Sequence, residues 1–191
     1  MFAFKKKYFL IIESIKDINL TDIKQYNKFI IIYRRFIYDE NLNDIIRFRK
    51  SCKLKFIKFY IANDIKLSKA VNSDGIYLSS YNKKFSSLRL KNNKFNIIGS
   101  AHNIKEITLK IKQGCNYILV SKLFLVQYDK SAPFLGVIKF NKILRNISSF
   151  LVPLGGINFE NLNCLKNINC NAVALFSEIK KKPTNIISRL F

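Results

Sequence analysis

Eight short runs of apolar residues recur along the chain, and segments with helical spacing separate several of them. The runs are rich in Ile, Val, Phe and Tyr, and they are apolar at successive positions rather than at alternate ones. Continuous runs of this kind are typical of strands buried on both faces, as in a parallel sheet. Eight of them alternating with helices predict an α/β fold, a TIM (β/α)8 barrel of eight parallel strands. The runs are Tyr8–Ile12, Phe29–Tyr33, Phe56–Ile61, Gly75–Leu78, Phe95–Ile98, Tyr117–Val120, Phe150–Leu154 and Ala172–Phe176.

Apolar residues recur at helical spacing in several of the segments between these runs. An open dinucleotide-binding sheet is disfavoured, because no Gly-x-Gly-x-x-Gly motif follows the first run. Only residues 180–191 follow the end of the eighth strand, so we expect the last helix of the barrel to be short. The clearest helical segments are Asn41–Cys52, Ile104–Gln113, Val137–Leu144 and Phe159–Leu165.

Length and composition favour one domain over residues 1–191. The chain has 191 residues and is 49% hydrophobic, which suffices for one buried core and is too little for two ordinary domains. No segment approaches the ~18 consecutive apolar residues of a membrane span. The apolar stretch near the N-terminus is too short for a signal peptide. We therefore expect a cytoplasmic protein without a membrane partner.

The formal net charge of +22 is high enough to suggest a nucleic-acid-binding protein. The basic clusters are scattered, however, and they lack the interleaved aromatic residues of a single-strand binding platform. Nucleic-acid binding is therefore disfavoured. A basic surface also suits small anionic ligands such as phosphates and pyrophosphates.

The chain contains four cysteines and one histidine, and no two cysteines form a Cys-x-x-Cys pair. This composition disfavours a zinc site. In a cytoplasmic chain, four thiols are most simply explained as reduced residues of the core. They are Cys52, Cys115, Cys164 and Cys170.

Polar residues follow most of the predicted strands, and in a TIM barrel the active site lies at these carboxyl-terminal strand ends. The set holds one carboxylate, several cations, several hydroxyls and a Gly-Gly pair, which is typical of an anion-binding site. It contains no pair of carboxylates and no cysteine–histidine pair. In chain order it is Arg34, Arg35, Asn63, Asp64, Ser79, Ser80, Asn82, Ser100, His102, Ser121, Lys122, Gly155, Gly156, Asn158 and Ser177.

The Gly155-Gly156 pair at the end of the seventh run is the strongest phosphate-binding signal. A helix that starts directly after such a pair presents unpaired backbone N–H groups and the positive end of its dipole to an anion. Ser177 ends the neighbouring eighth run. Together these two strand ends predict the phosphate cradle that many barrel enzymes share.

Several of the other candidates have a structural explanation as well as a functional one. Asp64 is placed either to cap the helix that starts at Ile65 or to bind a metal. His102 is placed either for a local hydrogen bond or for ligand binding. The long loop between the sixth and seventh strands, Phe124 to Gly136, is expected to be functional because of its position after a strand end.

Several groups of strand-end residues occur in a fixed order and at regular spacing. These segments are Asn63–Leu78, with Asn-Asp and Ser-Asp-Gly-Ile-Tyr-Leu, then Ile98–Asn103, Asn116–Phe124, Leu154–Asn161 and Ala172–Ser177. Taken together, from about residue 28 to 180, this ordered set resembles the motifs of the thiamine phosphate synthase/TenI superfamily, whose members are TIM barrels.

The resemblance implies a transferase of thiamine biosynthesis. Such an enzyme joins an aminopyrimidine pyrophosphate to a thiazole phosphate and releases pyrophosphate with the help of Mg²⁺, so it needs cations for the leaving group and a cradle for the thiazole phosphate. By this resemblance, Ser100 and Lys130 would be catalytic, Arg34, Asn63, His102, Gly155, Gly156 and Ser177 would bind the substrates, and Asp64 and Asn82 would bind Mg²⁺.

Two departures from the family pattern keep other functions open. The glutamine and lysine that flank the family's arginine are Ile32 and Phe36 here, and the second Mg²⁺-binding aspartate is Asn82, which removes a charge from the metal site. A TenI-like thiazole tautomerase needs no metal, although its catalytic histidine would fall at Lys122. A regulatory barrel that binds a phosphorylated ligand without catalysis is the third interpretation. A homo-oligomer is compatible with each of them.

Overall fold

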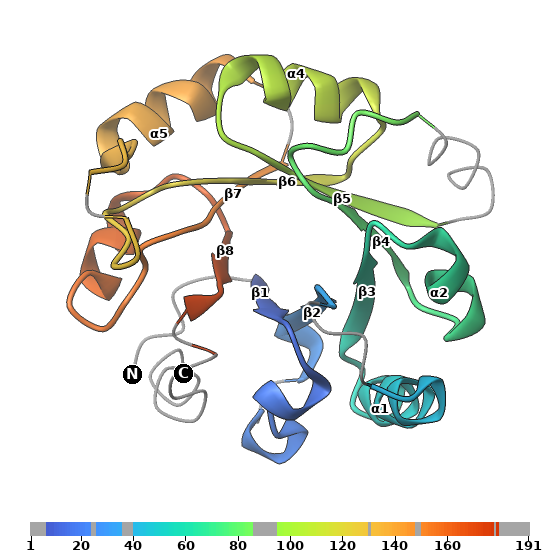
Figure 1. Cartoon of the computed structure of the whole chain (residues 1–191). Coiled ribbons are helices and arrows are strands. Elements are labelled where there is room, and N and C mark those ends of the chain that lie inside the picture. Colours follow the sequence, from blue (N-terminus) through green and yellow to red (C-terminus); the bar gives the residue numbers. More distant parts are fainter. Residues whose placement is uncertain are drawn as a thin grey trace.

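The computed structural model shows a ring of parallel strands with helices on its outside (Figure 1). In the described residues, eight strands pair in the order β7-β6-β5-β4-β3-β2-β1-β8, and every ladder is parallel. The ring closes between β7 and β8 through a bridge that joins Leu154 to Ala174. The predicted (β/α)8 barrel is therefore confirmed. The residues that the structure describes are 7–23, 26–35, 40–85, 95–129, 131–147, 150–177 and 179.

The strands agree closely with the apolar runs of the sequence. The third strand starts later than predicted, because Phe56 has a positive φ of 55° and is 79% exposed. The fifth strand continues further than predicted and includes Ser100 and Ala101. The strands are β1 Lys7–Ile12, β2 Phe29–Tyr33, β3 Lys58–Ala62, β4 Gly75–Leu78, β5 Asn96–Ala101, β6 Tyr117–Val120, β7 Phe150–Pro153 and β8 Ala172–Leu175.

Four α-helices lie outside the ring in the described part of the chain, and three of them begin with an asparagine or aspartate cap. The helix that was expected to start at Ile65 is present. The short last helix expected after the eighth strand would fall in residues 180–191, which lie outside the described residues. The helices are α1 Leu42–Leu54, α2 Ile65–Ala70, α4 Ile104–Lys112 and α5 Gly136–Asn146.

The helix predicted over Phe159–Leu165 was wrong. The structure has a 3-10 helix, η4, at Leu162–Asn167 instead. Asn158 and Asn161 explain the difference, because their side-chain oxygens accept hydrogen bonds from nearby backbone amides and compete with regular helix formation. Three further 3-10 helices lie between β1 and β2: η1 Ile15–Asp17, η2 Leu20–Asp22 and η3 Tyr26–Lys28.

The core has two layers, as the continuous apolar strands predicted. An inner layer fills the barrel and includes Phe9, Tyr60 and Leu119. An outer layer lies between the strands and the helices, where residues such as Ile107 and Phe140 pack. This arrangement leaves the carboxyl-terminal ends of the strands free to carry polar groups.

All four cysteines are free thiols, but they are not all core residues. Cys52 is fully buried, whereas Cys164 is exposed on η4. The expectation that Cys164 lies in the core was therefore wrong, because the polar 3-10 helix turns it toward solvent. Among the described residues, no helix has the length and apolar character to cross a membrane.

Candidate functional site

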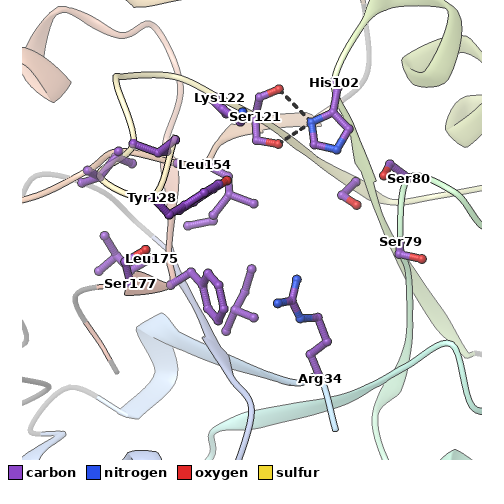
Figure 2. A pocket seen from close by; sticks show the side chains of 18 of the residues that line it. Arg34, Ser79, Ser80, His102, Ser121, Lys122, Tyr128, Leu154, Leu175 and Ser177 are labelled. Atoms are coloured by element: carbon purple, nitrogen blue, oxygen red, sulfur yellow. Dashed lines mark hydrogen bonds between the residues drawn. The ribbon is translucent and has the colours of Figure 1, made fainter. Parts of the chain in front are cut away.

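Two cavities lie side by side at the carboxyl-terminal ends of the strands. The first, which we call the barrel-mouth cavity, has a volume of about 610 Å³ and is lined by the larger part of the predicted site (Figure 2). Its lining residues come from the ends of β2, β4, β5, β6, β7 and β8. The second, the flanking cavity, has a volume of about 660 Å³ and lies at the ends of β2, β3 and β4. Arg34 and Tyr81 line both cavities, so the two spaces are neighbours.

The sequence candidates divide between these cavities. Arg34, Ser100, His102, Gly155, Gly156 and Ser177 line the barrel-mouth cavity. Asn63, Asp64 and Asn82 line the flanking cavity together with Arg34. Lys130 lies outside the described residues. The strand-end pattern thus brings six of the predicted residues to one cavity and three to the next.

The Gly-Gly pair makes a tight turn against the loop that follows β6. Gly155 has a φ of 94° and Gly156 a φ of 70°, a region that favours glycine. A Cβ on Gly156 would lie 2.4 Å from the carbonyl oxygen of Phe124 and 2.5 Å from that of Leu125. Phe124 N also donates to Gly155 O at 3.0 Å. Only glycine can occupy position 156 in this backbone arrangement.

No α-helix starts directly after the Gly-Gly pair, so that part of the cradle prediction was wrong. The amides of Asn158 and Asn161 donate to asparagine side chains, and η4 begins only at Leu162. The Gly156 amide donates no hydrogen bond to any residue that the structure describes. The cradle therefore consists of the backbone at Gly156 and of Ser177 at the end of the neighbouring strand.

Arg34 is one of two cations, with Lys122, that line the barrel-mouth cavity in the described residues. Its Nη2 atom lies 2.8 Å from Glu13 Oε1, and its guanidinium carbon lies 4.7 Å from the centre of the Phe176 ring. Its side chain is 43% exposed, and Figure 2 shows the guanidinium pointing into the cavity. The neighbouring Arg35 instead donates to the carbonyl oxygen of Glu40 at 2.9 Å. The two neighbouring arginines therefore have different contacts, and Arg34 is the one that lines both cavities.

A tyrosine that the sequence analysis did not select lies beside Ser100 in the barrel-mouth cavity. Tyr77 is buried in β4 and lines the same cavity as Ser100, of which only 6% is exposed. Burial raises the pKa of Tyr77, so its hydroxyl stays protonated. Tyr77 lies within a continuous apolar run, so the sequence pattern did not mark it as a site residue. The serine near the end of the next strand was the one sequence signal that could have pointed to it.

His102 and Ser121 form a polar pair at the rim of the same cavity. Ser121 Oγ lies 2.9 Å from His102 Nδ1, and Figure 2 shows the pair across the cavity from Arg34. Next to it, Lys122 Nζ lies 3.5 Å from Asp129 Oδ2 and 5.6 Å from the centre of the Tyr128 ring. These groups give the rim hydrogen-bonding capacity and one more cation near the Gly-Gly turn.

The loop between β6 and α5 contributes to the cavity as expected. Residues Leu125, Val126, Gln127 and Tyr128 line it. The loop is fixed at both ends, because Leu123 N donates to Leu154 O at 2.8 Å and Gly136 N donates to Leu123 O at 2.8 Å.

Asn63 is the polar centre of the flanking cavity. Its Oδ1 atom accepts hydrogen bonds from Ser79 N and Ser79 Oγ, each at 3.1 Å, and from Asn82 Nδ2 at 3.0 Å. Its Nδ2 atom donates to the Tyr81 hydroxyl at 3.2 Å. Asn63 therefore holds the segment after β4 in place from the barrel side.

Both predicted Mg²⁺ ligands make local hydrogen bonds in the structure. Asp64 caps α2, with Oδ1 accepting from Leu67 N at 2.9 Å, and Asn82 Oδ1 accepts from Lys84 N at 3.1 Å. Asp64 is the one carboxylate lining the flanking cavity in the described residues, whereas five cations line it: Arg34, Arg35, Lys66, Lys83 and Lys84. Such a charge balance repels a free dication and attracts a polyanion. Asp64 is thus the helix cap that the sequence offered as one alternative.

Comparison with known proteins identifies the family. The thiamine monophosphate synthase family model matches residues 25–179. A thiamine-phosphate synthase of Prochlorococcus marinus subsp. pastoris is 30% identical over 139 residues, which cover 72% of this chain and 40% of that protein. The corresponding Fusobacterium nucleatum protein is 28% identical over 149 residues, covering 74% of this chain and 72% of that protein. The chain spans less than half the length of the Prochlorococcus relatives it matches.

Solved structures agree on the fold. The thiamine phosphate pyrophosphorylase of Pyrococcus furiosus superposes with a TM-score of 0.74 over 98% of this chain and 96% of that one, at 17% identity. A 3-hexulose-6-phosphate synthase gives a TM-score of 0.70 over 96% of this chain and 97% of that one, at 10% identity. Because the family model covers more than half of its residues, the chain belongs to the thiamine monophosphate synthase family.

Proposed function

We propose that this chain joins an aminopyrimidine pyrophosphate to a thiazole phosphate and releases pyrophosphate, as a transferase of thiamine biosynthesis. The observation that carries the proposal is the position of Arg34, which lines both the cavity with the Gly156–Ser177 cradle and the flanking cavity with its cluster of cations. A two-substrate reaction between phosphorylated molecules needs two anion-binding regions that meet at one point.

The thiazole phosphate would bind in the barrel-mouth cavity. The Gly156 backbone and Ser177 supply hydrogen-bond donors for its phosphate group. Apolar neighbours such as Leu154 and Leu175 offer contact to a ring. His102 on the rim lies within the same cavity, which supports a role in substrate binding.

The pyrophosphate group of the other substrate would bind in the flanking cavity. Bond formation between the two heterocycles releases pyrophosphate with its electron pair, so negative charge grows on the leaving oxygen. Fixed cations stabilise such charge in the transition state. Arg34 and Lys83, which line this cavity, would supply such cations, and Asn63 bonds to the segment that carries Lys83.

Ser100 and Lys130 complete the proposal. Ser100 lies deep in the barrel-mouth cavity beside Tyr77, where the two hydroxyls can orient a heterocycle above them. Lys130 would neutralise the leaving group from the loop after β6. We assign no step to magnesium, because Asp64 is the one carboxylate among the described residues that line the flanking cavity.

A regulatory barrel that binds a phosphorylated ligand without catalysis is the second candidate. The observation that favours it is that both predicted Mg²⁺ ligands take part in local hydrogen bonds, Asp64 with Leu67 N and Asn82 with Lys84 N. The tautomerase interpretation has no comparable support, since Lys122 pairs with Asp129.

Incubation of the protein with both substrates, followed by chromatographic assay of thiamine phosphate, tests the proposal. We expect product, and we expect Lys130→Met to slow its formation while Lys139→Met, an exposed change on α5, does not. Absence of product together with retained thiazole phosphate binding would favour the regulatory binder. Isomerisation of the thiazole alone would favour the tautomerase.

A further inference from the structure

A lysine on an outer helix is buried behind the flanking cavity. Lys110 of α4 has no exposed surface, and its Nζ atom donates to the carbonyl oxygens of Ser79 and Asn82, each at 2.7 Å, and to Gln113 Oε1 at 3.0 Å. All three acceptors are neutral oxygens. In the described residues no carboxylate forms an ion pair with Lys110. Burial lowers the pKa of Lys110.

Gln113 extends the same set of contacts. It is fully buried, and its Nε2 atom donates to Asn82 O at 3.0 Å and to Lys84 O at 2.8 Å. Lys110 and Gln113 together therefore make four hydrogen bonds to the backbone of Ser79, Asn82 and Lys84, in addition to the bond between themselves.

The barrel wall leaves space for this arrangement. A Cβ added to Gly99 of β5 would lie 2.9 Å from Lys110 Cδ and 3.0 Å from Lys110 Cγ. The lysine stem passes over the strand where the side chain is missing. The ammonium group thus reaches the end of β4 from a helix on the outside of the barrel.

The segment that these two residues hold, 79–84, is part of the candidate site. Ser79, Ser80 and Tyr81 line the barrel-mouth cavity, and Tyr81 through Lys84 line the flanking cavity. Asn63 bonds this segment from the barrel side, while Lys110 and Gln113 bond it from behind. The segment has no regular secondary structure, so these side chains supply much of its fixation.

We propose that Lys110 and Gln113 are positioning residues that hold segment 79–84 in its ligand-binding shape, and that the Lys110 charge strengthens pyrophosphate binding from behind the cavity. The affinity part rests on the proposed function of the flanking cavity. An apolar residue at 110 would fill the space but would take one donor each from Ser79 O and Asn82 O, which would keep only Asn82 N and Gln113 Nε2 as donors among the described residues.

The proposal is tested by measuring the affinities for inorganic pyrophosphate and inorganic phosphate, and by hydrogen–deuterium exchange. The proteins compared are the wild type, Lys110→Met and the control Lys112→Met, which changes an exposed lysine on the same helix. For Lys110→Met we expect pyrophosphate affinity to fall about tenfold, since one nearby cation is lost. Phosphate affinity at the Gly156 cradle should stay within about twofold, and amide exchange in residues 79–84 should accelerate. Lys112→Met should match wild type in all three measurements.

Unchanged exchange and unchanged pyrophosphate affinity in Lys110→Met would overturn the proposal, and so would an equal loss of both anions. If Lys110→Met does not fold, Gln113→Met serves, because it keeps the lysine and should accelerate exchange in 79–84 with a smaller loss of pyrophosphate affinity. Wild-type protein that binds no pyrophosphate would contradict the proposed function instead, and the exchange measurement would still decide whether the two residues hold the segment.

Discussion

The guanidinium carbon of Arg34 lies 4.7 Å from the centre of the Phe176 ring, and Phe176 directly precedes Ser177 of the phosphate cradle. A cation–π contact of this kind fixes an arginine that also keeps an ion pair with Glu13. Through it, the end of β2 is joined to the end of β8, with β1 between the two strands in the sheet. The cation shared by the two cavities is therefore held next to the cradle rather than being free in solvent.

Replacement of Arg34 by methionine should reduce kcat/KM for thiamine phosphate formation by about a hundredfold, because a charge-assisted contact to the leaving group is lost. Steady-state kinetics with both substrates measures the effect. Arg47→Met on α1 is the matched control, since Arg47 is exposed, pairs with Asp44 and lines neither cavity. Equal values of kcat/KM for the two variants would show that Arg34 does not act in the reaction.

Alanine at Gly156 should destabilise the turn by about 1–3 kcal/mol and weaken phosphate binding, because a positive φ is combined with a clash. Gly136→Ala is the control for backbone strain alone. Gly136 also has a positive φ, of 67°, yet an added Cβ there meets nothing within 4 Å. Urea unfolding and phosphate titration should show the larger loss for Gly156→Ala. Similar losses in both variants would contradict the packing seen at the cradle.

The thiols should differ in reactivity. Burial raises the pKa of Cys52 from 9.0 to about 12, so this thiol stays protonated at neutral pH, while Cys164 is exposed. At pH 8 a thiol reagent should modify Cys164 rapidly and Cys52 only after unfolding, which mass spectrometry of labelled peptides can follow.

The same shift sets a pH dependence of stability. Because the pKa of Cys52 is higher in the folded state than in the unfolded state, the protonated thiol contributes to the free energy of unfolding. This contribution is complete below about pH 9 and is lost as the pH rises toward about 12. Denaturant unfolding between pH 8 and 11 should show a decline that is smaller in Cys52→Ala. A decline of equal slope in both proteins would show that other groups cause it.

Removal of divalent metal should leave pyrophosphate binding largely intact. The flanking cavity is lined by Arg34, Arg35 and three lysines against Asp64, so basic side chains neutralise the anion. Calorimetric titration with pyrophosphate in EDTA and in Mg²⁺ should give affinities within about threefold of each other, while added salt should weaken both. Complete loss of binding in EDTA would show that a metal is required.

The barrel itself could be predicted from the sequence because its strands are buried on both faces. Runs such as Phe29–Tyr33 and Tyr117–Val120 are therefore apolar at every position, and the strand ends where the run of apolar residues ends. Local hydrogen bonds limit this approach. The asparagines at 158 and 161 turn a helical pattern into a 3-10 helix, which the periodicity of apolar residues cannot reveal.

The lining of the barrel-mouth cavity was predictable where it depends on strand ends, as at Gly156, Arg34 and Ser100. It was not predictable where a residue's role depends on distant partners. Tyr77 looked like an ordinary strand residue, and Lys110 looked like one more surface lysine of an amphipathic helix. Asp64 was compatible with two roles, and only its bond to Leu67 N identifies it as the helix cap.

A crystal structure with thiazole phosphate and pyrophosphate bound together tests the two-cavity site most directly. We predict the thiazole phosphate group beside Gly156 and Ser177, the pyrophosphate in the flanking cavity, and Arg34 between them. Both ligands in one cavity, or pyrophosphate bound away from Arg34 and Lys83, would contradict it.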